Sequence, residues 1–209
     1  MILNKLAGIK YKNRFSQYKN AFIHFCEFKN IPLSSDTLES IKMLEKHTRK
    51  KYRQLGPINY KEIAERIKRL KNEKLKLSYQ TIIATGLRIS ELEGIIPADC
   101  TITAETITLA FIGKGGDKGT VIIQAVEYPE LCQKISELIA KTQADRKIFY
   151  SAIYLQKKAK ELGFRCHDLR RICAILEYKK ARKKSEVMRK LRHSNIKTTN
   201  IYLNNKIKF

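Results

Sequence analysis

The chain has 209 residues, enough for one domain with a sizeable core, or one domain with a small appendage. It carries 43 Lys and Arg against 20 Asp and Glu, a formal net charge of +23 at pH 7. Solubility alone does not require such an excess. It favours a polyanionic partner, most often nucleic acid, although an ordinary basic protein would have the same composition. No apolar run is long enough for a membrane span or an export signal.

The cysteines are odd in number and contain no C-x-x-C pair: Cys26, Cys100, Cys132, Cys166 and Cys173. This pattern indicates neither a disulfide framework nor a zinc site and is typical of a reducing compartment. The sequence also lacks an Asp/Glu cluster of metal-ligand type and the G-x-x-x-x-G-K-[ST] loop that binds nucleotide phosphates. The residues therefore suggest neither a metal nor a cofactor.

Apolar residues at helical spacing predict a helix over residues 13–29. A weaker helix is expected over 36–47, ending in the basic run KHTRKKYR from Lys46 to Arg53. Gly56 and Pro57 then interrupt the chain. We therefore expect two parts, a short helical N-terminal segment and a larger domain: residues 1–56 and residues 57–209.

The larger part is predicted to be mainly α with a small antiparallel β-sheet, an α+β fold. Asn59 with Glu62 three residues later predicts a helix start, and Gly86 ends an expected helix over about 73–85. The β-branched runs on either side of KGGDK predict a hairpin with a glycine-rich turn. Further helices are expected from Ile89 and over about 131–139, 151–162, 167–180, 184–192 and 196–203.

Four stretches combine basic and nucleophilic residues: TGLRISEL around Arg88, GKGGDK around Lys114, HDLRR around His167 and Arg170, and HSNIKTTNIY from His193 to Tyr202. Each alone is weak, because GKGG also suits an ordinary hairpin turn and H-x-x-R is common on helices. Together and in this order they resemble the catalytic domain of the tyrosine recombinases, the family of lambda-integrase-like phage integrases and Xer-type recombinases. The resemblance covers about residues 58–203.

The resemblance implies a site-specific DNA recombinase with the tyrosine-recombinase fold. Such an enzyme cleaves and rejoins strands through a covalent 3′-phosphotyrosyl intermediate, without metal or ATP, to integrate, excise or resolve a phage or mobile element. Tyr202 would be the nucleophile, and Arg88 and Arg170 would clamp the non-bridging phosphate oxygens. His167 would handle protons and position groups, and His193 would hydrogen-bond a non-bridging oxygen.

A lysine of the hairpin turn would protonate the departing 5′ oxygen in this family. Lys114 aligns with the family's G-K-G turn, and Lys118 is the alternative because GKGGDKG has an apparent extra residue. Glu91 would hold the arginines, or would be an ordinary solvated helix residue. Candidate DNA contacts are Lys46, Arg49, Lys50, Lys51, Arg53, Arg171, Lys197, Thr198 and Thr199. The two threonines are equally suited to capping a helix.

The chain departs from the family pattern in three places. Residues 1–56 are shorter than the family's N-terminal DNA-binding domain, few residues follow Tyr202, and Arg192 stands where the family usually has Gly before His. Because so short a tail is poorly suited to docking on a neighbouring subunit, we expect Tyr202 to be held in cis beside the arginines and His193.

The resemblance also implies the partners and the setting. Double-stranded DNA is the expected substrate, bound by a protein that is monomeric in solution and tetrameric on two DNA sites, with accessory DNA-bending proteins and no membrane. The expected location is cytoplasmic and nucleoid-associated, in a prokaryotic or phage context. Two other functions stay open: a DNA-binding regulator of the same fold that does not cut, and a type IB topoisomerase-like relaxer. The DNA target depends on which side chains reach base edges.

Overall fold

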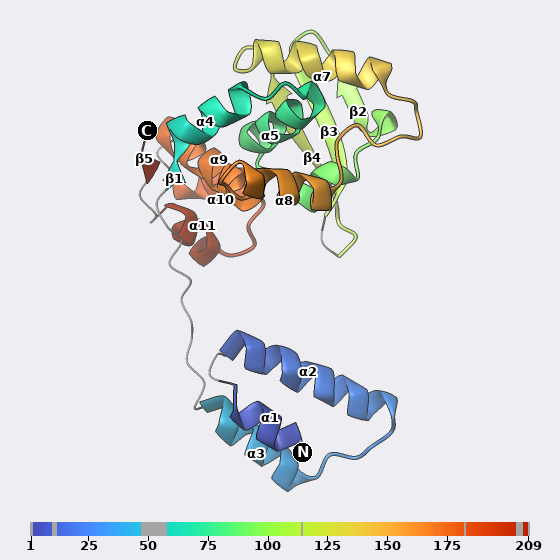
Figure 1. The fold of residues 1–209 in the computed structure, drawn as a ribbon, viewed down its shortest axis with the longest axis vertical. Helices are drawn as coiled ribbons and strands as arrows, with labels where there is room; N and C mark the ends of the chain where they lie inside the picture. Colours follow the sequence, from blue (N-terminus) through green and yellow to red (C-terminus); the bar gives the residue numbers. More distant parts are fainter. Residues whose placement is uncertain are drawn as a thin grey trace. The chain divides into compact units, whose positions relative to one another are not determined.

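A computed structural model describes residues 2–9, 12–46, 58–113, 115–181, 183–203 and 207–208. The chain divides into two compact units, Met1–Leu55 and Gly56–Phe209. The described part of the smaller unit contains α1 (Ile2–Ala7), α2 (Lys12–Phe28) and α3 (Ser35–Lys46) (Figure 1). Among the described residues, no helix has the length and apolar character needed to cross a membrane.

The smaller unit packs its helices around Leu6, Phe15 and Ile41, all buried. Phe15 lies on α2, where a helix was predicted, and Ile41 lies on α3, while Tyr18 and Phe25 of the same α2 pattern are half exposed. Lys46, one of the expected DNA contacts, is the exposed last residue of α3. The other basic positions of the run, Arg49, Lys50, Lys51 and Arg53, lie outside the described residues.

The larger unit is mostly helical with a small antiparallel sheet, which confirms the predicted fold class (Figure 1). Its helices are α4 (Tyr60–Lys68), α5 (Glu73–Thr85), α6 (Ile89–Glu93), α7 (Pro129–Lys141), α8 (Ala152–Glu161), α9 (Cys166–Ala181), α10 (Lys184–Lys190) and α11 (Ile196–Leu203), with a short 3₁₀ turn at Pro97–Asp99. Helix α7 packs against the sheet, and α5 packs against both α7 and α9.

The sheet has the order β2-β3-β4 and is antiparallel throughout. Its strands are β2 (Cys100–Ile102), β3 (Thr106–Ile112) and β4 (Lys118–Gln124). The predicted hairpin is β3–β4, but the first β-branched run also contains β2. The run divides because Thr103 Oγ1 accepts hydrogen bonds from the backbone N–H groups of Glu105 and Thr106, which closes a turn between β2 and β3.

Two predicted helix boundaries are confirmed by their capping geometry. Asn59 Oδ1 accepts a hydrogen bond of 3.2 Å from the backbone N–H of Glu62, which starts α4. Gly86 ends α5 with φ of 66°, a left-handed conformation that glycine adopts without strain. A Cβ atom on Gly86 would lie 2.5 Å from Leu191 Cδ2, so the glycine also permits the close approach of the segment after α10.

The main core joins α5, α9 and the sheet. Tyr79, Ile107 and Leu169 are buried at its centre, and Tyr79 Oη donates a hydrogen bond of 2.8 Å to the carbonyl oxygen of Leu155 on α8. This bond satisfies the one polar atom of an otherwise apolar buried ring. The α5–α9 contact brings together residues that are candidates for the active site. Arg88 lies just after the end of α5, and α9 contains His167 and Arg170.

The segment that follows α11 returns to the beginning of the larger unit. β5 (Ile207–Lys208) pairs in parallel with β1 (Ile58–Asn59), with Ile58 opposite Ile207. Sequence periodicity did not predict this pairing, because two-residue strands carry no periodic signal. As a result, both ends of the segment containing Tyr202 are attached to this same unit of the chain.

Candidate active site

The candidate site lies where three parts of the larger unit meet. Arg88 follows the end of α5, His167 and Arg170 lie one helical turn apart on α9, and the segment from α10 to α11 contributes His193 and Tyr202. Helices α9, α10 and α11 pack against one another, and α9 packs against α5. The fold thus brings together five residues from three separate segments of the sequence.

Tyr202 is held between two imidazole rings. Its Oη lies 2.5 Å from His167 Nε2, and its ring meets those of His167 and His193 edge to face, with centroids 5.3 and 5.0 Å away. Only 4% of the tyrosine is exposed. Burial raises the pKa of Tyr202, while the charge of Arg170 and a hydrogen bond from it oppose that rise. The phenol is therefore protonated at neutral pH and lies against a group that can accept its proton.

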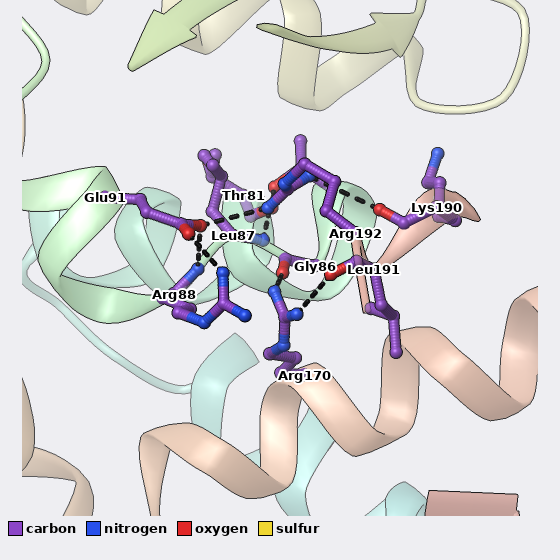
Figure 2. A network of polar contacts seen from close by, with 10 residues as sticks. Thr81, Gly86, Leu87, Arg88, Glu91, Arg170, Lys190, Leu191 and Arg192 are labelled. Carbon is purple, nitrogen blue, oxygen red and sulfur yellow. Dashed lines mark hydrogen bonds and ion pairs between the residues drawn. The ribbon is translucent and has the colours of Figure 1, made fainter. Parts of the chain in front are cut away.

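Arg170 is a buried cation that connects three elements. Its Nη1 donates to the carbonyl oxygen of Gly86 and its Nη2 to that of Leu191, so α9 is tied to the ends of α5 and α10 (Figure 2). Burial, together with the charge of Arg88, lowers the pKa of Arg170 from its ordinary value. A guanidinium has five N–H donors, so these two carbonyl bonds leave others available to Tyr202 and to a phosphate.

Glu91 accepts hydrogen bonds from Arg88. Its side chain is buried, so Glu91 is not an ordinary solvated helix residue. Its Oε2 accepts from the backbone N–H of Arg88 at 2.7 Å, and its Oε1 accepts from Arg88 Nη1 at 2.6 Å (Figure 2). Burial acts to raise the pKa of Glu91, but the hydrogen bonds from Arg88 and the charges of Arg192 and Arg88 outweigh it and hold that pKa below its ordinary value. The Arg88 side chain remains 41% exposed, which leaves its guanidinium accessible to a ligand.

Both histidines are neutral near pH 7. Burial and the charge of Arg170 lower the pKa of His167, and the same two causes lower the pKa of His193 to about 4. The Nδ1 of His193 is hydrogen-bonded to Thr199 Oγ1 at 2.9 Å. Since Thr199 is fully buried, this bond fixes the imidazole ring and leaves Nε2 as the atom available for a phosphate oxygen.

An open cleft of about 840 Å³ lies beside these residues. Arg88, His167 and Arg170 line one part of it, and Lys157 and Lys160 of α8 line another. The arginine and lysine side chains make this cleft positively charged, which suits a polyanion. The two lysines were missed in the sequence, although their spacing of three residues on a predicted helix places them on one face.

The comparison with known families identifies the family of the chain. The Phage integrase family matches residues 53–208, which is most of the chain. The chain belongs to the phage integrase family. None of the curated protein sequences compared with the chain matches it.

Several solved structures share the fold of this integrase. A XerH site-specific recombinase bound to its difH substrate, in a pre-cleavage complex, has a TM-score of 0.55 and 18% identity, covering 87% of this chain and 65% of that one. The XerA recombinase has a TM-score of 0.59 and 16% identity, with 92% and 78% covered. A lambda integrase (75–356) dimer bound to a COC′ core site has a TM-score of 0.56 and 16% identity, with 89% and 78% covered. The chain therefore spans somewhat less than two thirds of the XerH chain, and at these identities the likeness establishes the fold.

The turn between β3 and β4, where the candidate lysines Lys114 and Lys118 were predicted, begins beside Glu91. A Cβ atom on Gly113 would lie 4.0 Å from Glu91 Oε1, so the base of the turn adjoins the arginine site. Lys114 lies outside the described residues, and Lys118 is the exposed first residue of β4. The choice between the two lysines thus stays as the sequence left it. Within the described ranges, no group of three His, Cys, Asp or Glu residues is arranged to hold a metal ion.

Two residues that were predicted to contact DNA, Arg171 and Thr199, are buried, so these two predictions are wrong. Arg171 is 2% exposed and pairs with Asp168 Oδ1 at 3.1 Å, so its guanidinium does not face solvent. Thr199 is directed to His193 and does not cap α11. That helix is capped by Asn195, whose Oδ1 accepts from the backbone N–H of Lys197 at 2.8 Å. Lys197 and Thr198 are exposed, as a DNA contact requires.

Proposed function

We propose that this member of the phage integrase family cleaves and rejoins DNA at specific sites through a 3′-phosphotyrosyl bond to Tyr202. The contact of 2.5 Å between Tyr202 Oη and His167 Nε2 carries the proposal. It gives the buried phenol a proton acceptor in the same chain. Arg88 and Arg170, which lie in the same site, supply the positive charge that a transferring phosphate requires.

In the cleavage step Tyr202 Oη attacks the phosphorus of the scissile phosphodiester. The phenol proton passes to His167 Nε2, which is unprotonated near pH 7 because burial and Arg170 lower the pKa of His167. A P–Oη bond forms as the bond from phosphorus to the 5′ oxygen breaks, so the 3′ phosphate stays on the tyrosine. The guanidinium groups of Arg88 and Arg170 and the Nε2–H of His193 stabilise the charge on the non-bridging oxygens.

The departing 5′ oxygen takes its proton from a hairpin lysine, Lys114 or Lys118. Rejoining is the reverse reaction, in which a 5′ hydroxyl attacks the phosphotyrosyl bond and returns its proton to the lysine. Because the phosphotyrosyl bond retains the energy of the phosphodiester, the exchange needs no nucleotide hydrolysis. Glu91 is assigned the role of holding Arg88, through the two bonds described above.

Double-stranded DNA is the proposed substrate. The net charge of +23 and the basic cleft support it, and the XerH and lambda integrase structures with the same fold are complexes with DNA sites. We assign the smaller unit and the basic run after it to clamping the duplex, and residues 57–209 to catalysis. Recombination requires four active subunits on two sites, so the proposed assembly is a tetramer on DNA, acting in the nucleoid with accessory DNA-bending proteins.

Covalent trapping tests this function without knowledge of the target. The full chain is incubated with a pool of duplexes that have a randomised segment and single nicks at varied positions, so that a short cleaved strand dissociates and rejoining fails. Adducts are isolated under denaturing conditions and the attached strands are sequenced. We expect adducts joined through the 3′ phosphate at one sequence motif. They should be absent in Tyr202→Phe and retained in Tyr154→Phe, a matched change on α8 outside the site.

The other outcomes distinguish the alternative functions. DNA binding without any adduct from the wild-type chain contradicts the catalytic proposal and indicates a regulator that retains the fold. Adducts without a sequence motif, together with relaxation of a supercoiled plasmid, indicate a topoisomerase-like activity. Equal adduct yield from Tyr202→Phe and the wild type would show that Tyr202 is not the nucleophile.

A further inference from the structure

Arg192 has a backbone conformation that usually belongs to glycine. Its φ is 52°, and among the described residues the only other non-glycine with positive φ is Asn30. Asparagine tolerates this left-handed region better than arginine does. The family usually has glycine at this position, just before the histidine. An arginine here therefore has a conformational cost, which its side-chain contacts must offset.

The side chain of Arg192 is committed to contacts within the chain. Its Nη2 donates to Glu91 Oε2 at 3.0 Å and its Nη1 to the carbonyl oxygen of Lys190 at 3.3 Å (Figure 2). The guanidinium also lies over the ring of Phe111, with Cζ 4.7 Å from the ring centroid. Since both Nη atoms already have acceptors, Arg192 is poorly placed to bind a phosphate directly.

The same contacts place Arg192 between the hairpin and the arginine site. Phe111 is on β3 and its ring covers Gly119 of β4, where a Cβ atom would lie 2.6 Å from Cζ of that ring. Arg192 thus connects the base of the hairpin, the carboxylate of Glu91 and the segment that leads into His193. These parts are far apart in sequence, and 101 residues separate the two partners of the ion pair.

The charges of this cluster explain what Arg192 contributes. The Glu91 side chain is 1% exposed, so water screens its negative charge poorly. Arg88 alone would be neutralised by that carboxylate, and the pair would attract a phosphate only weakly. With Arg192 on the other oxygen, the three side chains carry a net charge of +1 beside the cleft.

We propose that Arg192 is a positioning residue that acts through Glu91, offsetting the charge of this carboxylate so that Arg88 attracts the phosphate. The inference rests on the proposed function of the site. It predicts more than a loss of packing: removing the charge of Glu91 should compensate for removing the charge of Arg192, because the net charge beside the cleft returns to +1. If Arg192 had only a structural role, the double variant would be slower than the single Arg192 variant, because it changes both partners of the ion pair.

The test measures the rate of covalent adduct formation on the nicked duplex recovered by the trapping experiment. The variants are Arg192→Gln, which is polar but uncharged, Arg192→Met, and each of these combined with Glu91→Gln. Arg189→Met is the matched control, because Arg189 is on α10 and pairs with Glu186, away from Glu91. We expect the single Arg192 variants to be about tenfold to a hundredfold slower. The double variants should be faster than the single ones, and the control should match the wild type.

Two further measurements separate the explanations. Thermal unfolding of every variant identifies any that is unfolded, and whichever of Arg192→Gln and Arg192→Met stays folded then carries the test. A single variant as fast as the wild type, or a double variant slower than the single, overturns the inference while leaving the proposed function intact. If the wild type forms no adduct, the proposed function fails, and calorimetric titration with inorganic phosphate takes the place of the rate. The same order of affinities is then expected, and equal affinities or no binding to the wild type overturn the inference.

Discussion

Tyr202 Oη and His167 Nε2 lie 2.5 Å apart in one chain, although 35 residues separate them in sequence. The contact forms because α11 packs on α9 and β5 returns the following segment to β1 of the same unit. Within this chain, Tyr202 therefore lies in the same site as Arg170, His167 and His193. In the proposed mechanism the phenol is thus already beside its proton acceptor, so substrate binding need only bring the phosphate to it.

Acidic pH should destabilise the protein through His193. Its pKa is about 4 in the folded chain and about 6.5 when unfolded. Between these values the unfolded state binds the proton and the folded state does not, so stability is full above about pH 6.5 and falls as pH drops toward 4. The loss approaches about 2–3 kcal/mol. Urea denaturation across this range measures it.

The control for that pH dependence is a second histidine. His193→Gln should reduce the slope of the curve, with a remainder from His167, whose pKa is lowered by the same causes. His24→Gln, at a side chain that is 78% exposed on α2, is the matched control. A curve of the same slope in His193→Gln and the wild type would show that another group is responsible.

Thr199 should control the orientation of His193. Thr199→Val keeps the shape of the buried side chain but removes the hydroxyl that bonds to His193 Nδ1. We expect a loss of about 1–2 kcal/mol in unfolding free energy and adduct formation about tenfold slower, with DNA affinity retained. Thr101→Val is the matched control, since Thr101 is exposed on β2 and has no role in the site. The assigned role is wrong if the two variants have the same rate.

Features that depend on near neighbours were predictable from the sequence, and features that depend on distant partners were not. Asn59 and Gly86 are caps whose effects involve residues within one turn, so their types were sufficient. The motifs around Arg170 and Tyr202 could be recognised because the family retains their order. By contrast, the ion pair of Glu91 with Arg192 joins positions 101 residues apart, and no local pattern indicates it.

Thr199 illustrates why residue type alone did not assign a role. A threonine near a helix start can cap the helix, bind phosphate or bond to a buried side chain, and all three use the same hydroxyl. Burial decides among them, and burial depends on how α11 packs on α9. The same reasoning applies to Arg171, whose charge suggested a surface contact but whose position on α9 faces the interior.

Replacement of Gly86 should disturb both the fold and the site. Gly86→Ala places a Cβ atom against Leu191 at a residue with φ of 66°, so we expect a loss of about 1–3 kcal/mol. It also displaces the carbonyl oxygen that accepts from Arg170, so adduct formation should fall with stability. Gly94→Ala is the control, because φ there is −77° and the nearest atom to an added Cβ is 3.8 Å away. Equal unfolding free energies for the two variants would contradict this explanation.

The lysines of α8 should contribute to DNA affinity without affecting chemistry. Lys157 and Lys160 line the cleft beside Arg88, so each lysine that contacts a phosphate releases about one counterion on binding. Lys157→Ala and Lys160→Ala should each weaken duplex binding and lower the slope of log affinity against log salt concentration by about one. The rate of adduct formation at saturating DNA should not change. Lys158→Ala is the matched control, because Lys158 pairs with Glu161 outside the cleft lining. If all three variants shift the salt slope equally, the duplex does not run along this face of α8.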